Sequence, residues 1–275
     1  MTTAQPSSTS DGTGLLAPTL AGRWQAVRER IAAAAKRSGR TADQVMLVVV
    51  TKSAAIDQVR ELVMLGQRDF GENRVQRLAQ RAQQIEEFVR RPAEMRPGTT
   101  APTIRWHMIG TLQRNKVKKA VEVARLVHSV DTLRLAEEIQ SAAAKRTEPF
   151  DVLVEANISG EASKHGVAAA ALRHFVEQVG SLHNVRVRGL MTMAPNLLDR
   201  DALRTLFTRT AELFHDVRTS GAAGNRFDIL SMGMSNDYEV AVECGANVVR
   251  VGSAIIGPPT AESLAESADE PDDEK

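Results

Sequence analysis

A lysine closes the first long apolar run of the sequence, where its amine could form a covalent bond with a carbonyl compound. The run LVVV, residues 47–50, is followed by Thr51 and Lys52. A lysine in a partly desolvated site loses its proton more easily and becomes a nucleophile. The alternative is an ammonium group that reaches solvent beside the strand, which is the more frequent outcome for a lone lysine. The choice depends on what else lies near Lys52.

Two short segments near the end of the chain could bind a phosphate group. SMGMSND, residues 231–237, and VGSAIIG, residues 251–257, each place Gly and Ser residues before a short apolar stretch. Backbone N–H groups at the start of a helix point towards an anion in such loops. For either segment alone, glycines that only permit a tight turn are the alternative.

Short apolar runs alternate with amphipathic segments, and this alternation defines the elements that position these residues. After a helix over 24–36, strands are expected over 45–51, 69–71, 105–109, 126–130, 152–158, 185–191, 227–231 and 248–252. The helices between them are expected over 54–65, 74–89, 116–124, 133–144, 168–179, 202–217 and 238–244, with a loop over 91–102. Strict alternation indicates parallel strands with crossover helices. We predict an α/β fold, a (β/α)8 TIM barrel with an extra N-terminal helix. An open doubly wound sheet is the alternative, but it usually has a glycine fingerprint where this chain reads TKSAA.

In such a barrel the active site lies at the carboxyl ends of the strands. Lys52 follows the first strand, and segments 231–237 and 251–257 follow the last two, where barrels commonly bind phosphate. This arrangement fits Schiff-base chemistry with pyridoxal 5'-phosphate (PLP), which carries both an aldehyde and a phosphate. Arg250 is two residues before Gly252 and shares its strand face, so it can point into the barrel as a partner for the pyridine nitrogen.

Length and composition indicate one barrel domain between two tails. Of the 275 residues, 1–20 and 259–275 contain few large apolar groups and are expected to be disordered, which leaves 21–258 for the PLP-binding barrel. The tails carry charges of −1 and −6, so the body carries +8, which suits an anionic ligand, nucleic acid or simply a soluble surface. Cys244, the one cysteine, allows no disulfide within the chain. With no signal segment or membrane span in the sequence, we expect a soluble, cytoplasmic protein.

Several blocks of the sequence together resemble the YggS/PROSC family of PLP homeostasis proteins, whose barrel is similar to that of alanine racemase. The blocks are VVVTKS, GQRDFGENRVQ, WHMIGTLQRNK, HSVDTLRLA, NISGEASKHG, VRGLMTMAP and LSMGMSNDYEVAVECGANVVRVGSAIIG, and the resemblance spans about 21–257. It implies that Lys52 holds PLP covalently as a Schiff base. It also implies that Lys164 at the mouth receives or passes on the cofactor. The other residues that the resemblance places around the cofactor are Asn73 and His107 beside the ring, Ser231, Met234, Ser235, Gly252 and Ser253 at the phosphate, and Arg250 at the pyridine nitrogen. Met191 is expected to pack either under the ring or into the barrel interior.

The resemblance implies a role in intracellular PLP, vitamin B6 and amino-acid homeostasis rather than robust turnover. Alanine racemases have a second, β-rich domain with a tyrosine base, whereas this chain becomes acidic after residue 258 and its one tyrosine, Tyr238, follows the seventh strand. Racemisation by two bases needs one on each face of the substrate, and the sequence shows no second base. A PLP-dependent amino-acid racemase or lyase stays the alternative. We expect a monomer whose partners are PLP and PLP-dependent apo-enzymes.

Two further classes of function are disfavoured by the residues. The basic segment RNKVKK, residues 114–119, lies near Trp106 but lacks interleaved aromatic residues, and only 4% of the chain is aromatic, so nucleic-acid binding is not expected. His107 and His128 lie on different predicted strands without the carboxylate spacing typical of a ligand set, so no metal is expected. Cys244, in VAVECGA, is expected to be a core residue.

Overall fold

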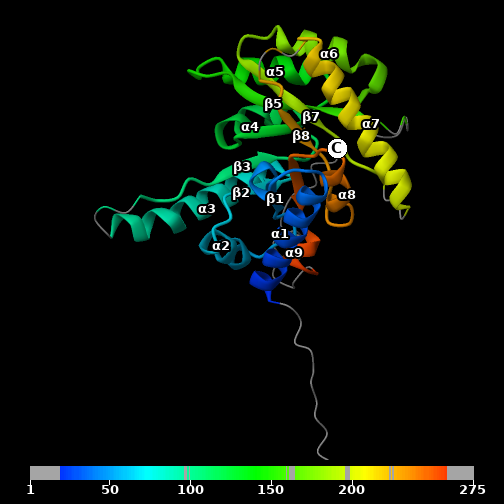
Figure 1. Cartoon of the computed structure of the whole chain (residues 1–275). Helices are drawn as coiled ribbons and strands as arrows, with labels where there is room; N and C mark the ends of the chain where they lie inside the picture. The colour runs from blue at the N-terminus through cyan, green and yellow to red at the C-terminus, as the bar shows by residue number, and fades with distance from the viewer. Residues whose placement is uncertain are drawn as a thin grey trace, which may run out of the picture.

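Parallel strands close into a barrel in the computed structural model, which describes residues 19–95, 98, 100–158, 160, 165–195, 199–222, 224 and 226–258 (Figure 1). β1 pairs with both β2 and β9, and β4 pairs with β5, which closes the ring. The barrel strands are β1 (Met46–Val50), β2 (Asp69–Glu72), β3 (Arg105–Met108), β4 (Leu126–Val130), β5 (Phe150–Asn157), β7 (Val185–Met191), β8 (Ile229–Ser231) and β9 (Val248–Val251). The predicted (β/α)8 barrel is confirmed. The two predicted tails fall almost entirely outside the described residues, as does Lys164.

Helices surround the barrel and pack one apolar face against it. On α5, for example, Leu135, Ala136 and Ile139 are buried at helical spacing. Short 3₁₀ helices cover Ala42–Gln44, Arg114–Lys116 and Ala169–Ala171, and a two-residue strand, β6 (Val167–Ala168), pairs with β5. The α-helices are α1 (Leu20–Arg37), α2 (Ile56–Met64), α3 (Val75–Glu94), α4 (Val117–Val123), α5 (Leu133–Ala143), α6 (Leu172–Gly180), α7 (Arg200–Thr219), α8 (Tyr238–Glu243) and α9 (Ser253–Ile256).

The extra N-terminal helix is α1, and it lies against α8 and α9, so it joins the two ends of the described chain. Thr19 caps it by accepting a hydrogen bond from the backbone N–H of Gly22 at 3.1 Å. Its inner face buries Trp24 and other apolar side chains. Arg23 Nε donates to the backbone oxygen of Ile255 at 2.7 Å. The helix thereby fixes the last turn of the barrel, next to the loop after β9.

Several predicted boundaries differ from those of the structure by a few residues, and two of them have an identifiable local cause. The loop predicted over 91–102 begins later, because α3 continues through Pro92 to Glu94 and its end projects from the barrel (Figure 1). A proline removes only one helical N–H donor, and two residues past Pro92 the helix stops. The helix predicted over 168–179 starts at Leu172, because Ala168 belongs to β6 and a 3₁₀ turn follows.

Gly189 permits β7 and β8 to approach each other closely. Its φ is +155°, and a Cβ atom placed there would lie 1.7 Å from the backbone oxygen of Ile229. No side chain can occupy that space, so only glycine is compatible with the pairing of these two strands. The pairing brings Met191 level with Ser231 at the carboxyl ends of the strands, where the loops of the candidate site begin.

Candidate functional site

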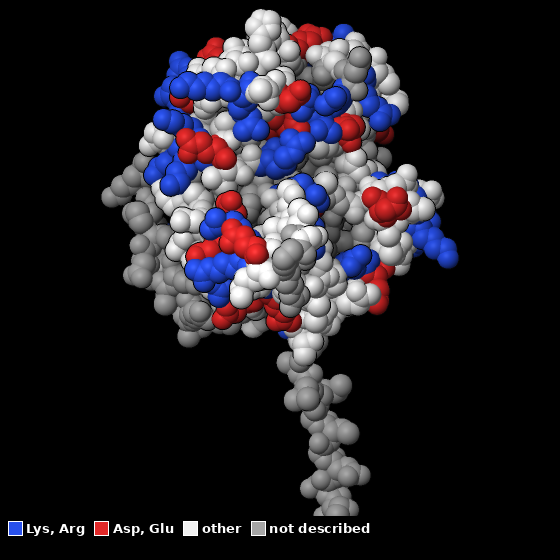
Figure 2. Space-filling model, turned by 90° about the vertical axis from the view of Figure 1, so that its left-hand side faces the viewer, with Lys and Arg blue, Asp and Glu red and all other residues white. Residues whose placement is uncertain are grey.

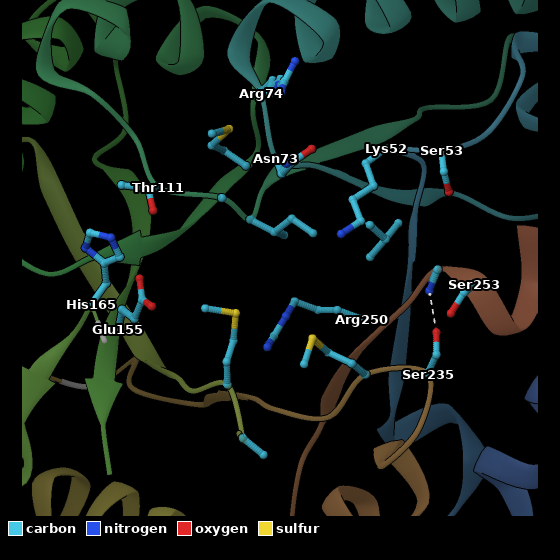
Figure 3. Close-up of a pocket in the computed structure, with 18 of the residues that line it drawn as sticks. Lys52, Ser53, Asn73, Arg74, Thr111, Glu155, His165, Ser235, Arg250 and Ser253 are labelled. Carbon is cyan, nitrogen blue, oxygen red and sulfur yellow. Dashed lines mark hydrogen bonds between the residues drawn. The ribbon is translucent and has the colours of Figure 1, made fainter. Parts of the chain in front are cut away.

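A cavity of about 1060 Å³ opens at the carboxyl ends of the strands (Figure 3). Ligand pockets are typically about 300–1,000 Å³, so this cavity can hold a small cofactor and a further small molecule. In Figure 3, Lys52 and Arg250 both point into it, and Ser235 and Ser253 lie on one wall. The predicted site residues that line it are Lys52, Asn73, Met234, Ser235, Arg250, Gly252 and Ser253.

Lys52 lies in the loop between β1 and α2, and two arginines of α3 hold the backbone of that loop. The Lys52 side chain is exposed to the cavity, whereas Arg77 and Arg81 are buried. Arg77 donates to the backbone oxygen of Lys52, and Arg81 donates to that of Ala54. A guanidinium group offers five donors in a rigid fork, so it suits the fixing of backbone carbonyls. The loop that carries Lys52 is therefore tied to α3.

A buried carboxylate completes this support. Glu72, at the end of β2, is fully buried; its Oε1 accepts from Thr51 Oγ1 at 2.5 Å and lies 3.3 Å from Arg81 Nε. Burial raises the pKa of Glu72, and the positive charges of Arg81 and Arg77 and the Thr51 hydrogen bond act in the opposite direction. We name Thr51, Glu72, Arg77 and Arg81 the loop clamp. It fixes the position of the backbone from which the Lys52 side chain extends into the cavity.

The loops after β8 and β9 meet in one wall that offers donors to an anion. Ser235 Oγ accepts from the backbone N–H groups of Gly252 at 3.2 Å and Ala254 at 3.3 Å. A serine hydroxyl that accepts two hydrogen bonds still has its own proton to donate. Asp237 accepts from the backbone N–H of Met234 and holds the turn before α8. Ser235 and the nearby hydroxyl of Ser253 are thus available to a phosphate group.

Arg250 is the buried cation of the site. Its side chain comes from β9, is 3% exposed and still reaches the cavity. One terminal nitrogen donates to Ser231 Oγ at 2.6 Å, and the other donates to the backbone oxygen of Thr192 at 2.9 Å. Burial lowers the pKa of Arg250 to about 10, against the effect of Asp237 and Glu155. Arg250 therefore keeps its charge at neutral pH, and it can only donate hydrogen bonds.

Three predicted site residues lie in the barrel interior and not on the cavity wall. His107 is 2% exposed and its ring nitrogens contact His128 at 3.0 Å and Asp69 at 3.2 Å. Met191 packs with apolar residues of β4 and β5, the second of the two places considered for it from the sequence. Ser231 contacts Arg250. Their side chains follow the inward face of their strands, so any effect they have on a ligand passes through neighbours such as Arg250.

Sequence reasoning missed Glu155, which lines the cavity from β5. Its side chain is 4% exposed and points into the cavity, on the wall that also carries His165 (Figure 3). Burial and then the negative charge of Asp131 raise the pKa of Glu155, while His165 and Arg250 act against this. A carboxylate within the apolar run VLVEAN was the available signal, because a charged side chain inside a buried strand needs a polar partner or a cavity. Arg74, Thr111, Gln113 and Lys116, which also line the cavity, lie in the segments after β2 and β3 and were not predicted as site residues either.

The remaining polar candidates do not add a catalytic or metal site. Tyr238 is not on the cavity wall; its side chain is 1% exposed, and burial raises the pKa of its hydroxyl. In the described part of the chain, no group of three or more His, Cys, Asp or Glu side chains is placed to hold a metal ion. Cys244 is partly buried and packs against the core, near Arg204.

Basic side chains on the surface lie among acidic ones. On the face in Figure 2, Lys and Arg side chains are interspersed with Asp and Glu. At the amino-terminal end of the barrel, Asp151 accepts from Arg125 at 3.0 Å, Arg186 at 2.5 Å and Arg188 at 2.9 Å. Lys116, from the basic segment 114–119, is part of the cavity wall. Many basic side chains are thus paired with acidic ones, whereas Lys52, Lys116 and Arg250 line the cavity.

The fold and the cavity with its lysine are those of one class of (β/α)8 barrels. Comparison with known families identifies this class. Residues 23–259 match the family model of the alanine racemase N-terminal domain. D-threonine aldolase from Filomicrobium marinum has the same fold, with a TM-score of 0.60 over 84% of this chain and 60% of that one, at 18% identity.

Closer relatives have a more specific name. The pyridoxal phosphate homeostasis protein of Aquifex aeolicus is 36% identical over 86% of this chain and 96% of its own length, and that of Pseudomonas aeruginosa is 37% identical over 87% and 95%. PipY of Synechococcus elongatus, solved with PLP bound, has a TM-score of 0.72 at 30% identity over 87% of this chain and all of that one. This chain belongs to the family of pyridoxal phosphate homeostasis proteins.

Proposed function

We propose that this protein binds PLP in the cavity of Figure 3, with Lys52 as the point of covalent attachment, and serves in the homeostasis of PLP and amino acids in the cytoplasm. The observation that carries the proposal is the meeting of three groups at one cavity: an amine on Lys52, a cation on Arg250 and hydroxyl donors on Ser235 and Ser253. The names of the relatives and the PLP-bound PipY structure support the choice of ligand.

The residues present fit the cofactor. When bound, PLP supplies an aldehyde that reacts with amines and a ring that withdraws electrons from the attached group. Ser235, with its proton free to donate, and Ser253 would hold the phosphate at the wall formed by the loops after β8 and β9. The loop clamp would present the amine of Lys52 to the aldehyde. Asn73 and Met234 would line the sides.

Arg250 would determine how strongly the ring withdraws electrons. Its pKa, lowered to about 10 by burial, leaves it charged at neutral pH, and it has only donors. A donor facing the pyridine nitrogen occupies the lone pair that a proton would need, so that nitrogen stays unprotonated. The ring is then a weaker electron sink, which suits holding the cofactor more than turning over amino acids.

An amino-acid racemase or lyase is the second candidate, and Glu155 is the observation that favours it. The sequence offered no second base, but Glu155 is a buried carboxyl group with a raised pKa on the cavity wall, away from Lys52 in Figure 3. Groups with such shifts are found at catalytic sites. Incubation of the PLP-loaded protein with a panel of L-amino acids, with chiral chromatography and keto-acid detection, separates the two functions: a holding protein gives neither product above the rate of free PLP.

The partners are PLP itself and, as recipients, PLP-dependent apo-enzymes, with this protein acting as a monomer.

Among the described helices none is long and apolar enough to cross a bilayer. No role for nucleic acid is proposed, because Lys116 of the basic segment faces the cavity and the arginines around Asp151 are engaged with its carboxylate.

Titration of the purified full-length protein with PLP tests this function. The wild type should turn yellow and develop the absorbance of lysine-bound PLP. Lys52→Ala should lose that absorbance, whereas Lys118→Ala, which removes an exposed lysine of α4 outside the cavity, should retain it. A wild type that stays colourless with excess PLP would exclude the proposal.

A further inference from the structure

A continuous line of buried polar side chains crosses the barrel interior from β2 to Arg250. Asp69 Oδ1 lies 3.2 Å from His107 Nε2, and His107 Nδ1 lies 3.0 Å from His128 Nε2. His128 Nδ1 lies 3.0 Å from Ser231 Oγ, which accepts from Arg250 at 2.6 Å. All five residues are at most 6% exposed. They come from five strands of the barrel: β2, β3, β4, β8 and β9.

We propose that these five side chains form a hydrogen-bonded relay with one proton order, meaning that each hydrogen bond has one fixed donor and one fixed acceptor. In this order both histidines are neutral and carry their proton on Nε2. In this order Ser231 donates to His128, His128 donates to His107, and His107 donates to Asp69. His128 and Ser231 are then positioning residues for Arg250.

The two ends of the relay limit the proton orders that are available. An arginine has only donors, so Ser231 Oγ must accept from Arg250. The Asp69 carboxylate has only acceptors and also receives two hydrogen bonds from Arg105, at 2.7 Å and 2.5 Å. His107 must therefore present an N–H to Asp69.

Between these ends three orders satisfy every contact, and they differ in whether neither histidine, His107 or His128 carries a positive charge. If His107 is neutral, its one proton is on Nε2 and its Nδ1 is an acceptor, so His128 must donate from Nε2. If His128 is also neutral, its Nδ1 is an acceptor and the Ser231 hydroxyl donates to it. If His128 is a cation, its Nδ1 donates to Ser231 Oγ, which then accepts two hydrogen bonds. In the reverse order, His107 is a cation that donates from both nitrogens, His128 carries its proton on Nδ1, and Ser231 Oγ accepts twice.

The charges around the relay favour the neutral order. Asp69 already has a full cationic partner in Arg105, so a charged His107 would add a buried cation without its own anion. Asp237 and Glu155 act on Arg250 as negative charges, so Arg250 has acidic neighbours outside the relay. Burial is the largest of the causes that hold the pKa of His128 well below its usual value, in agreement with a neutral His128 ring.

The neutral order has a consequence for the cavity. A hydroxyl that donates to a histidine becomes a better acceptor, so the hydrogen bond from Arg250 to Ser231 is strengthened. Together with the bond to the Thr192 oxygen, it holds both terminal nitrogens of Arg250 and so fixes the direction of the remaining N–H groups. That these groups face a pyridine nitrogen rests on the proposed function; the proton order itself does not.

Long-range ¹H–¹⁵N correlation spectra of the full-length protein, labelled with ¹⁵N-histidine and free of cofactor, test the proton order at pH 7. We expect His107 and His128 in the Nε2–H form, with Nδ1 shifts of an unprotonated nitrogen. An Nδ1–H form of His128, or a doubly protonated His107, would overturn the proposal. Ser231→Ala should shift the Nδ1 signal of His128. Thr210→Val, which removes a buried hydroxyl that donates to the Leu206 carbonyl in α7, should leave both histidines unchanged.

A binding measurement tests the positioning role. Ser231→Ala should weaken PLP binding about tenfold, as expected for loss of a hydrogen bond to a charged group, while Ser231→Thr, which keeps the hydroxyl, should restore most of it. Ser231→Ala that binds PLP as the wild type does, with the same absorbance maximum, would refute the role of the relay at the site. If the wild type itself fails to bind PLP, the proposed function fails, and the spectra still decide the proton order.

Discussion

The loop clamp allows a prediction whose size follows from burial and charge. Glu72→Gln keeps an oxygen that can accept from Thr51 but removes the negative charge beside the buried Arg81. Removal of one member of a buried ion pair typically costs about 3–5 kcal/mol. Thr51→Val keeps the ion pair and removes one hydrogen bond to a charged group, worth about 1.5–3 kcal/mol. Glu72→Gln should therefore destabilise the protein more than Thr51→Val.

Urea unfolding of the cofactor-free protein at pH 7 measures both free energies. Thr210→Val serves as the control, because it removes a buried hydroxyl hydrogen bond between uncharged groups and should cost about 0.5–1.5 kcal/mol. Against a total stability of about 5–15 kcal/mol for a typical domain, these three costs are separable. If Glu72→Gln costs no more than Thr210→Val, Glu72 is already uncharged in the folded protein and an ion pair does not hold the Lys52 loop.

Three further predictions concern pH and backbone geometry. Burial raises the pKa of Glu155, so the folded state binds more protons than the unfolded state above pH 4.5. Stability should therefore fall as pH rises through the raised pKa, and this fall should be smaller in Glu155→Gln than in the wild type in thermal melts from pH 4 to 8, because the raised pKa of Glu72 contributes in both proteins. Burial acts to raise the pKa of Asp69, but the hydrogen bonds from His107 and Arg105 lower this pKa overall. The Asp69 carboxylate therefore stabilises the folded protein above pH 3.8, and this stabilisation is lost as pH falls through the lowered pKa. Asp69→Asn should be less stable than the wild type by about 2 kcal/mol at pH 7, and a difference that does not shrink in acid would contradict this. Gly189→Ala should cost more than about 3 kcal/mol or prevent folding, because its Cβ would overlap the backbone of the next strand, whereas Gly66→Ala, also at positive φ but in open space, should cost about 1 kcal/mol by circular dichroism melts.

Periodicity was enough to predict the barrel, because parallel strands buried on both faces are apolar runs and crossover helices are amphipathic. β4 and β7 start and end where the sequence predicted. The errors arose where local signals competed. Pro92 suggests a break, yet one lost donor near a helix end is tolerated, so α3 extends to Glu94.

The cavity wall was predictable where it consists of strand ends, as Lys52, Ser235 and Gly252 show. Contacts between distant segments were not. Arg77 and Arg81 are charged residues of a helix, normally solvent-facing, and nothing in their spacing shows that they reach the backbone of the Lys52 loop.

The relay is a second set of contacts between distant segments that the sequence could not predict. His107 and His128 were recognised as a pair on different strands, but their ring-to-ring contact and its continuation to Arg250 depend on the register of five strands. The order of residue types along the chain does not by itself specify how these strands are aligned with one another.

The most direct test of the account is to identify the lysine that holds PLP. The full-length protein is loaded with PLP, reduced with borohydride, digested and analysed by mass spectrometry. The account predicts a phosphopyridoxyl group on Lys52, in near-stoichiometric amount, with the other lysines essentially unlabelled. A label on Lys116, the other lysine of the described cavity wall, or a label spread over surface lysines with Lys52 unmodified, would contradict it.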